Sequence, residues 1–354
     1  MANWGTLYPA MPRLRPRLPL SRLIVRGFLP LALALNNSLN ILSCYAAEAD
    51  KSTQRPKVAL ALGGGGTRGI AHIGVLRVLE KEGIPIDAIA GTSMGALVGG
   101  LYCAGLSCDQ IEKIFQQRKI VHAFNTVPLS VRVALIPIMI LPRLVGHHPY
   151  EGLYRGNKFA KYLSRLVPED KRNIENLSPP FWAIATNLLD GEAHAIKHGD
   201  IGRAIQASSA IPVLRRPVEI DDMLMIDAGT LENVPTEHAR EMGCDYVIAV
   251  DVDERVMPVE AKTFRAIGSV SNRVINMTLC KVDEPQLAMA DAVIQPDLRG
   301  IRLLSYKPRD GLKALAAGED AARAAVPYLK QQLEELQRRR QKGSEALSAV
   351  EENH

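Results

Sequence analysis

The sequence predicts an α/β fold in which helices cover both faces of a mostly parallel central sheet. Two observations predict it: short apolar runs of strand length end in glycine, and amphipathic helical segments follow them. Alternating strands and helices favour one parallel sheet, because each helix returns the chain to the same end of the sheet. The chain of 354 residues, 47% hydrophobic and 23% charged, is long enough for a sizeable core.

The individual elements can be placed from the spacing of apolar residues and from glycines that end helices. Residues 70–82 carry apolar side chains on one helical side before Gly83. Residues 246–252 are an almost continuous apolar run, as expected of a buried parallel strand. The expected strands are 58–62, 87–90, 181–186, 223–226 and 246–252, and the expected helices are 70–82, 93–104 and 319–342.

The positive charge of the chain is concentrated in its first 43 residues. These hold five arginines and no acidic residue, so that 38 basic residues balance 38 acidic ones in the rest of the chain. A nucleic-acid-binding protein needs a basic body, and this class is therefore excluded. The arginines precede an apolar run at 28–35, which Asn36 interrupts and which is too short to span a membrane. This order is typical of a secretory signal segment.

Two processing sites are compatible with this leader. Residues 41–44, Ile-Leu-Ser-Cys, resemble a bacterial lipoprotein box, in which the cysteine becomes the first mature residue and carries the lipid. Cys44-Tyr45-Ala46 is an alternative cleavage site of an ordinary secreted protein, and an unprocessed extension is a third alternative. We expect an exported bacterial lipoprotein, attached to a membrane through Cys44 and facing the periplasm, with a soluble periplasmic or secreted protein as the alternative.

The remaining chain divides into a linker, one large domain and a charged end. Cys103 and Cys108 are close enough to form a disulfide in an exported protein, and the alternative is two small core thiols. The cysteine spacing fits no zinc site, and neither a metal nor another cofactor is expected. The expected segments are a leader at 1–43, a linker at 44–56, the domain at 57–330 and a charged C-terminal helix and tail at 331–354.

Residues 131–145 form a strongly apolar segment. Pro137 and Pro142 exclude a straight helix there. One interpretation is a buried segment of the core. The other is an apolar cover over a lipid site, or a surface that dips into a bilayer.

A glycine-rich loop, residues 63–69, directly follows the first strand and opens a helix. Gly64, Gly66 and Gly69 fit the G-x-G-x-x-G pattern of a dinucleotide site. Such a site also needs an acidic residue at the end of the second strand, whereas Asp87 begins that strand. No lysine follows the glycines as in a phosphate loop. The loop nevertheless presents bare N–H groups at a helix N-terminus, which suit an anion such as an oxyanion.

Residues 91–95, Gly-Thr-Ser-Met-Gly, form a G-x-S-x-G pattern between a strand and a helix. At such a turn this pattern predicts a nucleophile elbow, which exposes the Ser93 hydroxyl above the sheet. The glycines two residues before and two after the serine are needed because side chains there would clash. Both this turn and the glycine loop follow strands of one parallel sheet, so both lie at its carboxyl edge.

A serine nucleophile needs a base, and Asp227 is the candidate. It ends the expected strand 223–226 and precedes Ala228-Gly229. None of the eight histidines lies in a strand-end loop with turn glycines, and His72 is expected to be packed or hydrogen-bonded in the first helix. Residues 251–254, Asp-Val-Asp-Glu, end another strand and are expected to be solvated.

The order of glycine loop G-G-G-x-R-G, elbow G-x-S-x-G and strand-end aspartate is similar to the patatin-like phospholipase family, and residues 62–76 look like its bacterial branch. The resemblance covers about residues 57–255. Ala228 stands where the family usually has glycine, and Val213 where it often has one. Further matching blocks are Ala185-Thr186-Asn187-Leu188, Gly191-Glu192, Ala207-Ser208-Ser209-Ala210-Ile211-Pro212, Asn233-Val234-Pro235 and 247–251.

The resemblance implies a three-layer fold and a Ser–Asp dyad without cofactor or metal. Ser93 would attack an acyl ester of a phospholipid or lysophospholipid, and Asp227 would accept its proton. The N–H groups of Gly64, Gly65 and Gly66 would hold the oxyanion. The expected partners are this lipid and a membrane surface, without nucleic acid; the oligomeric state, the head group and the acyl position stay open.

Some alternatives remain open beside the dyad. One is a catalytically silent lipid-binding lipoprotein with the same fold, and another is a Ser-His-Asp carboxylesterase with His238 as the base. Arg68 either steadies the glycine loop or meets a lipid phosphate.

Overall fold

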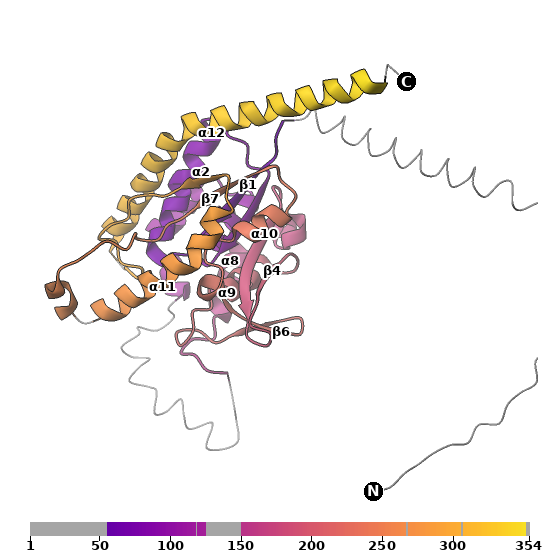
Figure 1. Cartoon of the computed structure of the whole chain (residues 1–354). Coiled ribbons are helices and arrows are strands. Elements are labelled where there is room, and N and C mark those ends of the chain that lie inside the picture. Colours follow the sequence, from indigo (N-terminus) through magenta and orange to yellow (C-terminus); the bar gives the residue numbers. More distant parts are fainter. Residues whose placement is uncertain (1–54, 118, 125–149, 267, 306, 352–354) are drawn as a thin grey trace, which may run out of the picture. The chain divides into compact units, whose positions relative to one another are not determined.

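The structure is a computed structural model that describes residues 55–117, 119–124, 150–266, 268–305 and 307–351 (Figure 1). The leader, Cys44 and the apolar segment 131–145 lie outside the described residues, and so do the predictions made for them. The chain divides into two compact units. One is Pro56–Arg338, which contains the sheet; the other comprises Met1–Arg55 and Arg339–His354, of which Arg55 and the end of the last helix are described.

Eight strands within the described residues form one mixed sheet. Hydrogen-bonded neighbours follow the order β5-β6-β3-β2-β1-β7-β8, and β4 also pairs with β3. The pairs among β3, β2, β1, β7 and β8 are parallel, whereas β4, β5 and β6 pair antiparallel. The expected mostly parallel α/β sheet is confirmed. The strands are β1 Val58–Leu62, β2 Ala88–Thr92, β3 Phe181–Asn187, β4 Ala193–Ile196, β5 Val218–Ile220, β6 Met223–Asp227, β7 Tyr246–Val250 and β8 Ala292–Ile294.

The register places the ends of β2 and β6 beside each other. In β3, Ala183 and Ile184 each pair with both β4 and β2, and Ala185 pairs with both β4 and β6. Since one strand edge holds one partner at a time, β4 occupies one edge of β3 and both β2 and β6 occupy the other. On that edge Thr92 of β2 faces Ile184 and Asp227 of β6 faces Ala185. The two strands therefore meet end to end at neighbouring positions.

Helices cover both faces of the sheet, as β1 illustrates. Its residues Val58, Leu60 and Leu62 belong to the core under α2 and α3, whereas Ala59 and Ala61 belong to a second core that contains Ala239 of α10. The alternation follows from the strand's period of two. The helices are α2 Ala71–Lys81, α3 Met94–Cys103, α4 Cys108–Gln116, α5 Lys119–Phe124, α8 Asn157–Leu166, α9 Ile201–Ser208, α10 Thr236–Glu241, α11 Ser269–Ala288 and α12 Pro308–Glu351, and short 3₁₀ turns are η1 Gly66–Ile70, η2 Glu169–Lys171, η3 Ile174–Asn176, η4 Ala228–Thr230 and η5 Ala261–Arg265.

The last helix, α12, begins earlier than the expected residue 319, at Pro308. The prediction stopped short because Gly311 and Gly318 are poor helix formers. In the structure a Cβ at Gly318 would lie 2.1 Å from the Ala71 carbonyl oxygen, and one at Gly74 would lie 2.2 Å from that of Leu315. These glycines therefore let α2 and α12 approach each other closely.

Cys103 and Cys108 are free, buried thiols, so the core interpretation holds and the disulfide does not. Burial raises the pKa of Cys103 and that of Cys108 above the ordinary value. Among the described residues, no helix is both long and apolar enough to cross a bilayer.

Candidate active site

Ser93 lies at a strained turn between β2 and α3. Its φ of 53° is in the left-handed region, which a residue with a side chain rarely adopts. A Cβ at Gly91 would lie 2.6 Å from the Ala96 nitrogen, and one at Gly95 would lie 2.1 Å from the Leu62 carbonyl oxygen. Only glycine fits at either position, as expected for the elbow. Strain of this kind is common where a side chain must be presented to a reactant.

The Ser93 hydroxyl interacts with the Asp227 carboxylate and lowers the pKa of that carboxyl. The side chains are almost fully buried, and Asp227 Oδ1 also accepts a hydrogen bond of 2.9 Å from the Gly229 N–H. Burial raises the pKa of Asp227 to about 6, although the hydrogen bonds from Ser93 and Gly229 act in the opposite direction. The structure thus brings together the two residues that the sequence predicted as nucleophile and base.

The end of α9 holds both residues of this pair. The Ser208 hydroxyl accepts a hydrogen bond of 2.8 Å from the Ser93 N–H. The Ala210 carbonyl oxygen accepts one of 3.1 Å from the Asp227 N–H. In the sequence this segment is visible only as the block 207–212 that matches the family, and no role for Ser208 follows from that match.

The glycine loop leaves fewer N–H groups for a ligand than the sequence suggested. The Gly64 N–H donates to the Asn233 carbonyl oxygen at 3.0 Å, so this N–H is already occupied in the structure, and the role of Gly64 as an oxyanion donor stays a prediction. Within the described residues, the N–H groups of Gly65 and Gly66 have no hydrogen-bond acceptor. Gly66 has a φ of 53°, and a Cβ there would lie 2.2 Å from the Leu303 carbonyl oxygen. A Cβ at Gly64 would lie 3.3 Å from Ser93 Cβ, so the loop adjoins the serine.

The chain that carries this loop, elbow and aspartate is similar to known proteins. A family model described as patatin-like phospholipase matches residues 60–240, just over half of the chain. The chain belongs to the patatin-like phospholipase family. An uncharacterized NTE family protein of Mycobacterium tuberculosis is 35% identical over 206 residues, which are 57% of this chain and 51% of that protein. Human patatin-like phospholipase domain-containing protein 6 is 32% identical over 197 residues, 55% of this chain and 13% of that protein.

The chain thus spans about half the length of its mycobacterial relatives and a small part of the mammalian ones. Among solved structures, VipD from Legionella pneumophila matches with a TM-score of 0.43 and 15% identity, over 78% of this chain and 67% of VipD.

In this patatin-like chain, Ala228 replaces the usual glycine after the aspartate without strain. It lies in the 3₁₀ turn η4 and is not among the residues with positive φ.

The histidines have structural roles in this patatin-like domain. His72 Nε2 lies 2.7 Å from the Gly63 carbonyl oxygen, which confirms the expected hydrogen-bonded histidine, and burial lowers the pKa of His72 to about 4. His238 Nδ1 lies 2.8 Å from Glu232 Oε2. Burial lowers the pKa of His238, but the hydrogen bond and charge of Glu232 outweigh this, and the net shift is upward. Within the described residues no hydrogen bond joins His238 to Ser93, whose N–H donates to Ser208.

Arg68 steadies the glycine loop from inside the protein. Its guanidinium is fully buried, where it donates to the Ile301 carbonyl oxygen at 2.6 Å, to Asn276 Oδ1 at 3.1 Å and to Glu254 Oε2 at 2.8 Å. The side chain therefore ties the loop to α11 and to residues after β8. Of the two roles that the sequence left open, the structure favours the first, because a buried guanidinium does not reach a lipid phosphate.

The carboxylates after β7 are buried, so the expectation of a solvated group at 251–254 is wrong for Asp251 and Asp253. Their oxygens meet an oxygen of Asp283 from α11 within 4.8 Å. Burial raises the pKa of Asp283 to about 7 and that of Asp253 well above its ordinary value. Asp253 and Asp283 both accept from the Asn233 side-chain amide, at 3.1 and 3.2 Å.

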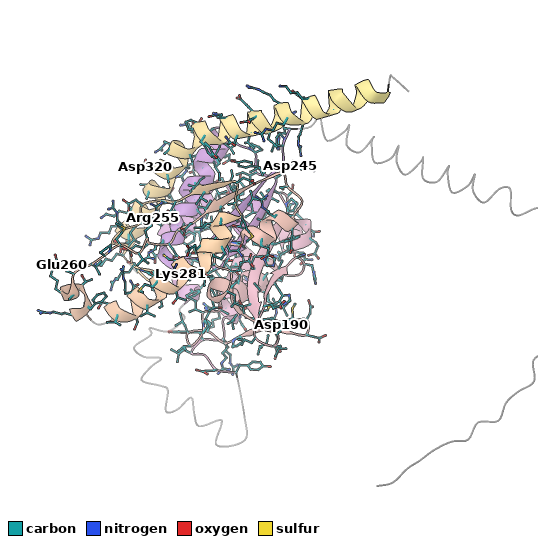
Figure 2. The ribbon with its side chains drawn as sticks, viewed as in Figure 1. Asp190, Asp245, Arg255, Glu260, Lys281 and Asp320 are labelled. Carbon is teal, nitrogen blue, oxygen red and sulfur yellow. The ribbon has the colours of Figure 1, made fainter. Side chains whose placement is uncertain are left out.

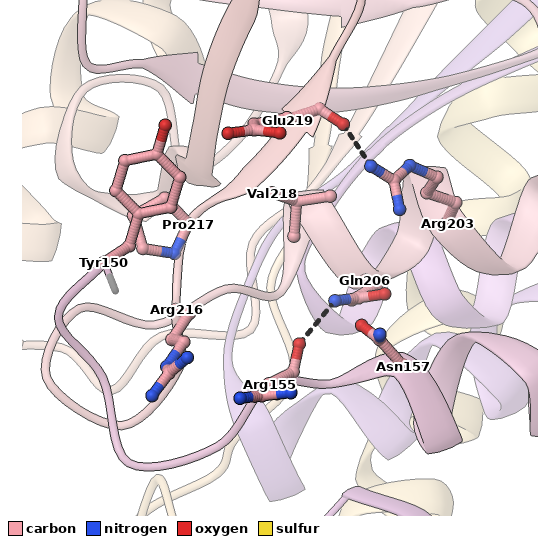
Figure 3. Close-up of a pocket in the computed structure, with 9 residues that line it drawn as sticks. All are labelled: Tyr150, Arg155, Asn157, Arg203, Gln206, Arg216, Pro217, Val218 and Glu219. Carbon is pink, nitrogen blue, oxygen red and sulfur yellow. Dashed lines mark hydrogen bonds between the residues drawn. The ribbon is translucent and has the colours of Figure 1, made fainter. Parts of the chain in front are cut away.

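A separate cavity of about 250 Å³ lies between α9, the start of α8 and β5 (Figure 3). Gln206 Nε2 donates to the Arg155 carbonyl oxygen at 2.9 Å across it. Neither Ser93 nor Asp227 lines it, so the cavity is not part of the site built around the elbow. Its lining includes Tyr150, Arg155, Arg203, Gln206, Arg216 and Glu219.

Proposed function

We propose that the protein is a serine lipid acyl hydrolase that cleaves acyl esters of phospholipids or lysophospholipids. Membership of the patatin-like phospholipase family supports the class of reaction. The observation that carries the proposal is the placement of Ser93, at a strained elbow, beside the buried Asp227 carboxylate, with both residues held by the end of α9. A nucleophile within hydrogen-bond reach of its base is the arrangement that covalent acyl transfer requires.

In this mechanism the Ser93 oxygen attacks the ester carbonyl carbon as its proton passes to Asp227. The tetrahedral intermediate then collapses, the bond to the leaving alcohol breaks, and Asp227 returns the proton to that alcohol. Water repeats the sequence on the acyl-enzyme and releases the fatty acid. Each step moves one proton between oxygen atoms, so Asp227 suffices as acid and base.

The raised pKa of Asp227 makes it a better base than an exposed aspartate. An ordinary aspartate, with a pKa near 3.9, is a weak proton acceptor for a serine. Burial brings the pKa of Asp227 to about 6, closer to neutral pH, while the side chain remains largely ionised at pH 7. The same burial excludes water, which strengthens the hydrogen bond between the two side chains.

The N–H groups of Gly65 and Gly66 are the proposed oxyanion donors. They begin the 3₁₀ turn η1, and α2 follows it, so the helix dipole adds to their positive field. Loss of one such donor typically lowers the rate by about 10²–10³-fold. Charge stabilisation of this size compensates for an aspartate that is a weaker base than histidine.

A serine-directed fluorophosphonate tests the proposal directly. Wild-type protein should become covalently labelled and should release fatty acid from lysophosphatidylcholine or phosphatidylcholine. Ser93→Ala should do neither, although it should keep the wild-type circular dichroism. A folded wild-type protein that neither labels nor releases fatty acid would instead be a catalytically silent lipid-binding protein.

We infer that the enzyme is exported and attached to a membrane through lipid on Cys44. The basic leader and the Ile-Leu-Ser-Cys sequence at 41–44 support this location. Several acyl chains anchor a protein far more stably than one does. With a palmitate analogue, the full chain should label and sediment with membranes, and Cys44→Ser should do neither. If neither protein labels and both sediment equally, Cys44 is an ordinary leader residue.

A further inference from the structure

Helix α11 has its polar and apolar faces reversed with respect to an ordinary surface helix. Its buried residues are Asn276, Asp283 and Gln286, all of them polar. The opposite face carries Val270, Val274 and Met277, at spacings of four and three residues, and each exposes about half of its surface. The polar face is inside because it hydrogen-bonds other residues, and this leaves the apolar face outside.

The exposed apolar residues continue into the segment before the helix. On α11 itself, Val274 and Met277 line an open groove of about 450 Å³, together with Thr278, Lys281 and Val282. Figure 1 shows the 3₁₀ turn η5 and the first half of α11 at the periphery of the unit. We call this region the α11 surface and define it by Val256, Met257, Val259, Phe264, Val270, Val274 and Met277, all of them exposed. A contiguous apolar surface rimmed by charges is typical of an interaction site.

The charges around the α11 surface are mostly positive. Residues 255–284 contain five basic residues, of which Lys262 pairs with Glu260 and Lys281 with Glu284. Arg255, Arg265 and Arg273 are the remaining basic residues, and the one other acid, Asp283, is buried. Figure 2 labels Arg255, Glu260 and Lys281, which lie along this segment. Basic side chains beside exposed apolar ones are typical of a helix that lies at the surface of an anionic bilayer.

The buried face of α11 contacts segments that flank the candidate active site. Asn276 Oδ1 accepts from Arg68 of the glycine loop, and Asp283 Oδ1 accepts from the Val234 N–H at 3.2 Å. A Cβ at Gly229, two residues after Asp227, would lie 3.8 Å from a Leu279 methyl group. One helix therefore separates the site from the α11 surface.

We propose that the α11 surface docks the protein on a bilayer containing anionic phospholipid, with α11 parallel to the membrane plane. This inference rests on the proposed function, since a lipid acyl hydrolase must meet its substrate at an aggregate surface. Apolar side chains enter the boundary between head groups and acyl chains, while the basic residues face the head groups. The site then lies one helix diameter, about 10 Å, from the lipid surface.

Vesicle flotation tests the docking in the full chain. All variants carry Cys44→Ser, which removes the proposed lipid anchor, and Ser93→Ala, which keeps the lipid intact. Val274→Glu/Met277→Glu should reduce binding to phosphatidylcholine–phosphatidylglycerol vesicles by about tenfold or more, because two apolar side chains that enter the bilayer in this proposal become charged. The matched control, Val293→Glu/Leu312→Glu, changes two exposed residues elsewhere and should bind as the parent does. Binding of the parent should weaken without phosphatidylglycerol and in high salt.

Activity separates the docking from the chemistry. With Ser93 restored, Val274→Glu/Met277→Glu should lose about tenfold or more of its rate on vesicles and keep its rate on dissolved p-nitrophenyl butyrate. A parent inactive on both substrates would refute the proposed function, and flotation would still decide the docking. Equal flotation of variant and control overturns the inference. A change from dimer to monomer in the variant also overturns it, because a second copy of the chain would then cover the α11 surface. A large fall in the melting temperature of the variant overturns it as well, because another segment of this chain would then cover that surface.

Discussion

Ser93 and Asp227 are held by the same three-residue segment at the end of α9. Ser208 accepts from the N–H of Ser93 at 2.8 Å, and Ala210 accepts from the N–H of Asp227 at 3.1 Å. Beside them, β2 and β6 meet end to end along β3. The distance between the serine and the aspartate is therefore fixed by the sheet and by α9 together, which is the preorganisation that a proton transfer needs.

The first prediction is that Ser93 and Asp227 act as one catalytic unit. Ser93→Ala, Asp227→Asn and the double variant should each lose at least about 10³-fold in kcat, to a similar residual level, because members of one unit are not additive. Initial rates of fatty acid release, measured for all three variants, check this. Multiplicative losses in the double variant would contradict a shared role.

The same assay distinguishes the dyad from a triad that contains a histidine. His238→Ala should retain most of the activity, because no hydrogen bond joins His238 to Ser93 among the described residues. His72→Ala removes the hydrogen bond to Gly63, so it is interpreted only if the protein stays folded. A folded His238→Ala variant as inactive as Ser93→Ala would establish the carboxylesterase alternative.

The second prediction concerns the pH dependence of activity. Asp227 must be ionised to accept a proton, and its pKa is raised to about 6. The value of kcat/KM should therefore rise about tenfold per pH unit below pH 6 and level off above it, since this ratio reports ionisations of the free enzyme. Rates on a dissolved ester between pH 4 and 8 measure this rise of kcat/KM. A midpoint near pH 4 would mean that Asp227 is not the base, or that burial does not raise its pKa.

The third prediction is that the same burial destabilises the folded protein at neutral pH. The pKa of this carboxyl is about 6 in the folded state against 3.8 in the unfolded state. The free energy of unfolding of the protein therefore falls as the pH rises between these values. Asp227→Asn should thus be more stable than wild type by up to about 3 kcal/mol at pH 8 and similar near pH 4. Urea unfolding at several pH values checks the difference, in which the acids that both proteins retain cancel. An equal difference at every pH would exclude a titration effect.

The parts of the site that depend on local sterics could be predicted from the sequence. The elbow is such a part at Gly91, because a Cβ there would meet the backbone of Gly95 and Ala96. The clash at Gly95 is instead with the Leu62 carbonyl oxygen, which is distant in sequence. Asp227 could be predicted because a strand and its end are visible in the chain. The hydrogen bond of the Gly64 N–H could not, since its acceptor, Asn233, is distant in sequence.

The interior of the site could not be predicted for the same reason. Asp253 looks like a solvated residue at the end of β7, and only the packing of α11 shows that it is buried beside Asp283. The reversed faces of α11 concealed this helix too, since its inner face hydrogen-bonds Arg68 and Asn233 and is polar. Sequence periodicity identifies helices whose buried face is apolar.

The fourth prediction tests the glycine loop as an oxyanion site. A Cβ at Gly65 would lie 2.6 Å from Val252 Cγ2, so Gly65→Ala should displace the loop and lower kcat by about 10²-fold. Val252→Ala should have a small effect alone and should restore part of the activity in the double variant, because it removes the clash. Calorimetry should show no binding of NAD or ATP to the wild type. Nucleotide binding that Gly65→Ala abolishes would refute the oxyanion role.

The fifth prediction concerns Val213, which stands where the family often has glycine. Its φ is 68°, a conformation that is strained for a β-branched residue, and Leu214 N–H donates to the Pro212 carbonyl oxygen at 2.8 Å across it. The Val213 side chain is 69% exposed, so its removal sacrifices little packing. Val213→Gly should therefore raise the free energy of unfolding by about 1 kcal/mol, the relief of strain less the greater freedom of glycine in the unfolded chain.

The matched control for this prediction is Val256→Gly. Val256 is also exposed, and it is not among the residues with positive φ, so glycine relieves no strain there. This variant should lose about 0.5–1 kcal/mol through the entropy of glycine in the unfolded chain. Urea midpoints of the two variants, compared with wild type at constant slope, measure the two effects. Opposite signs establish that the turn after Pro212 carries backbone strain, whereas two losses of equal size would show that Val213 is relaxed in this turn.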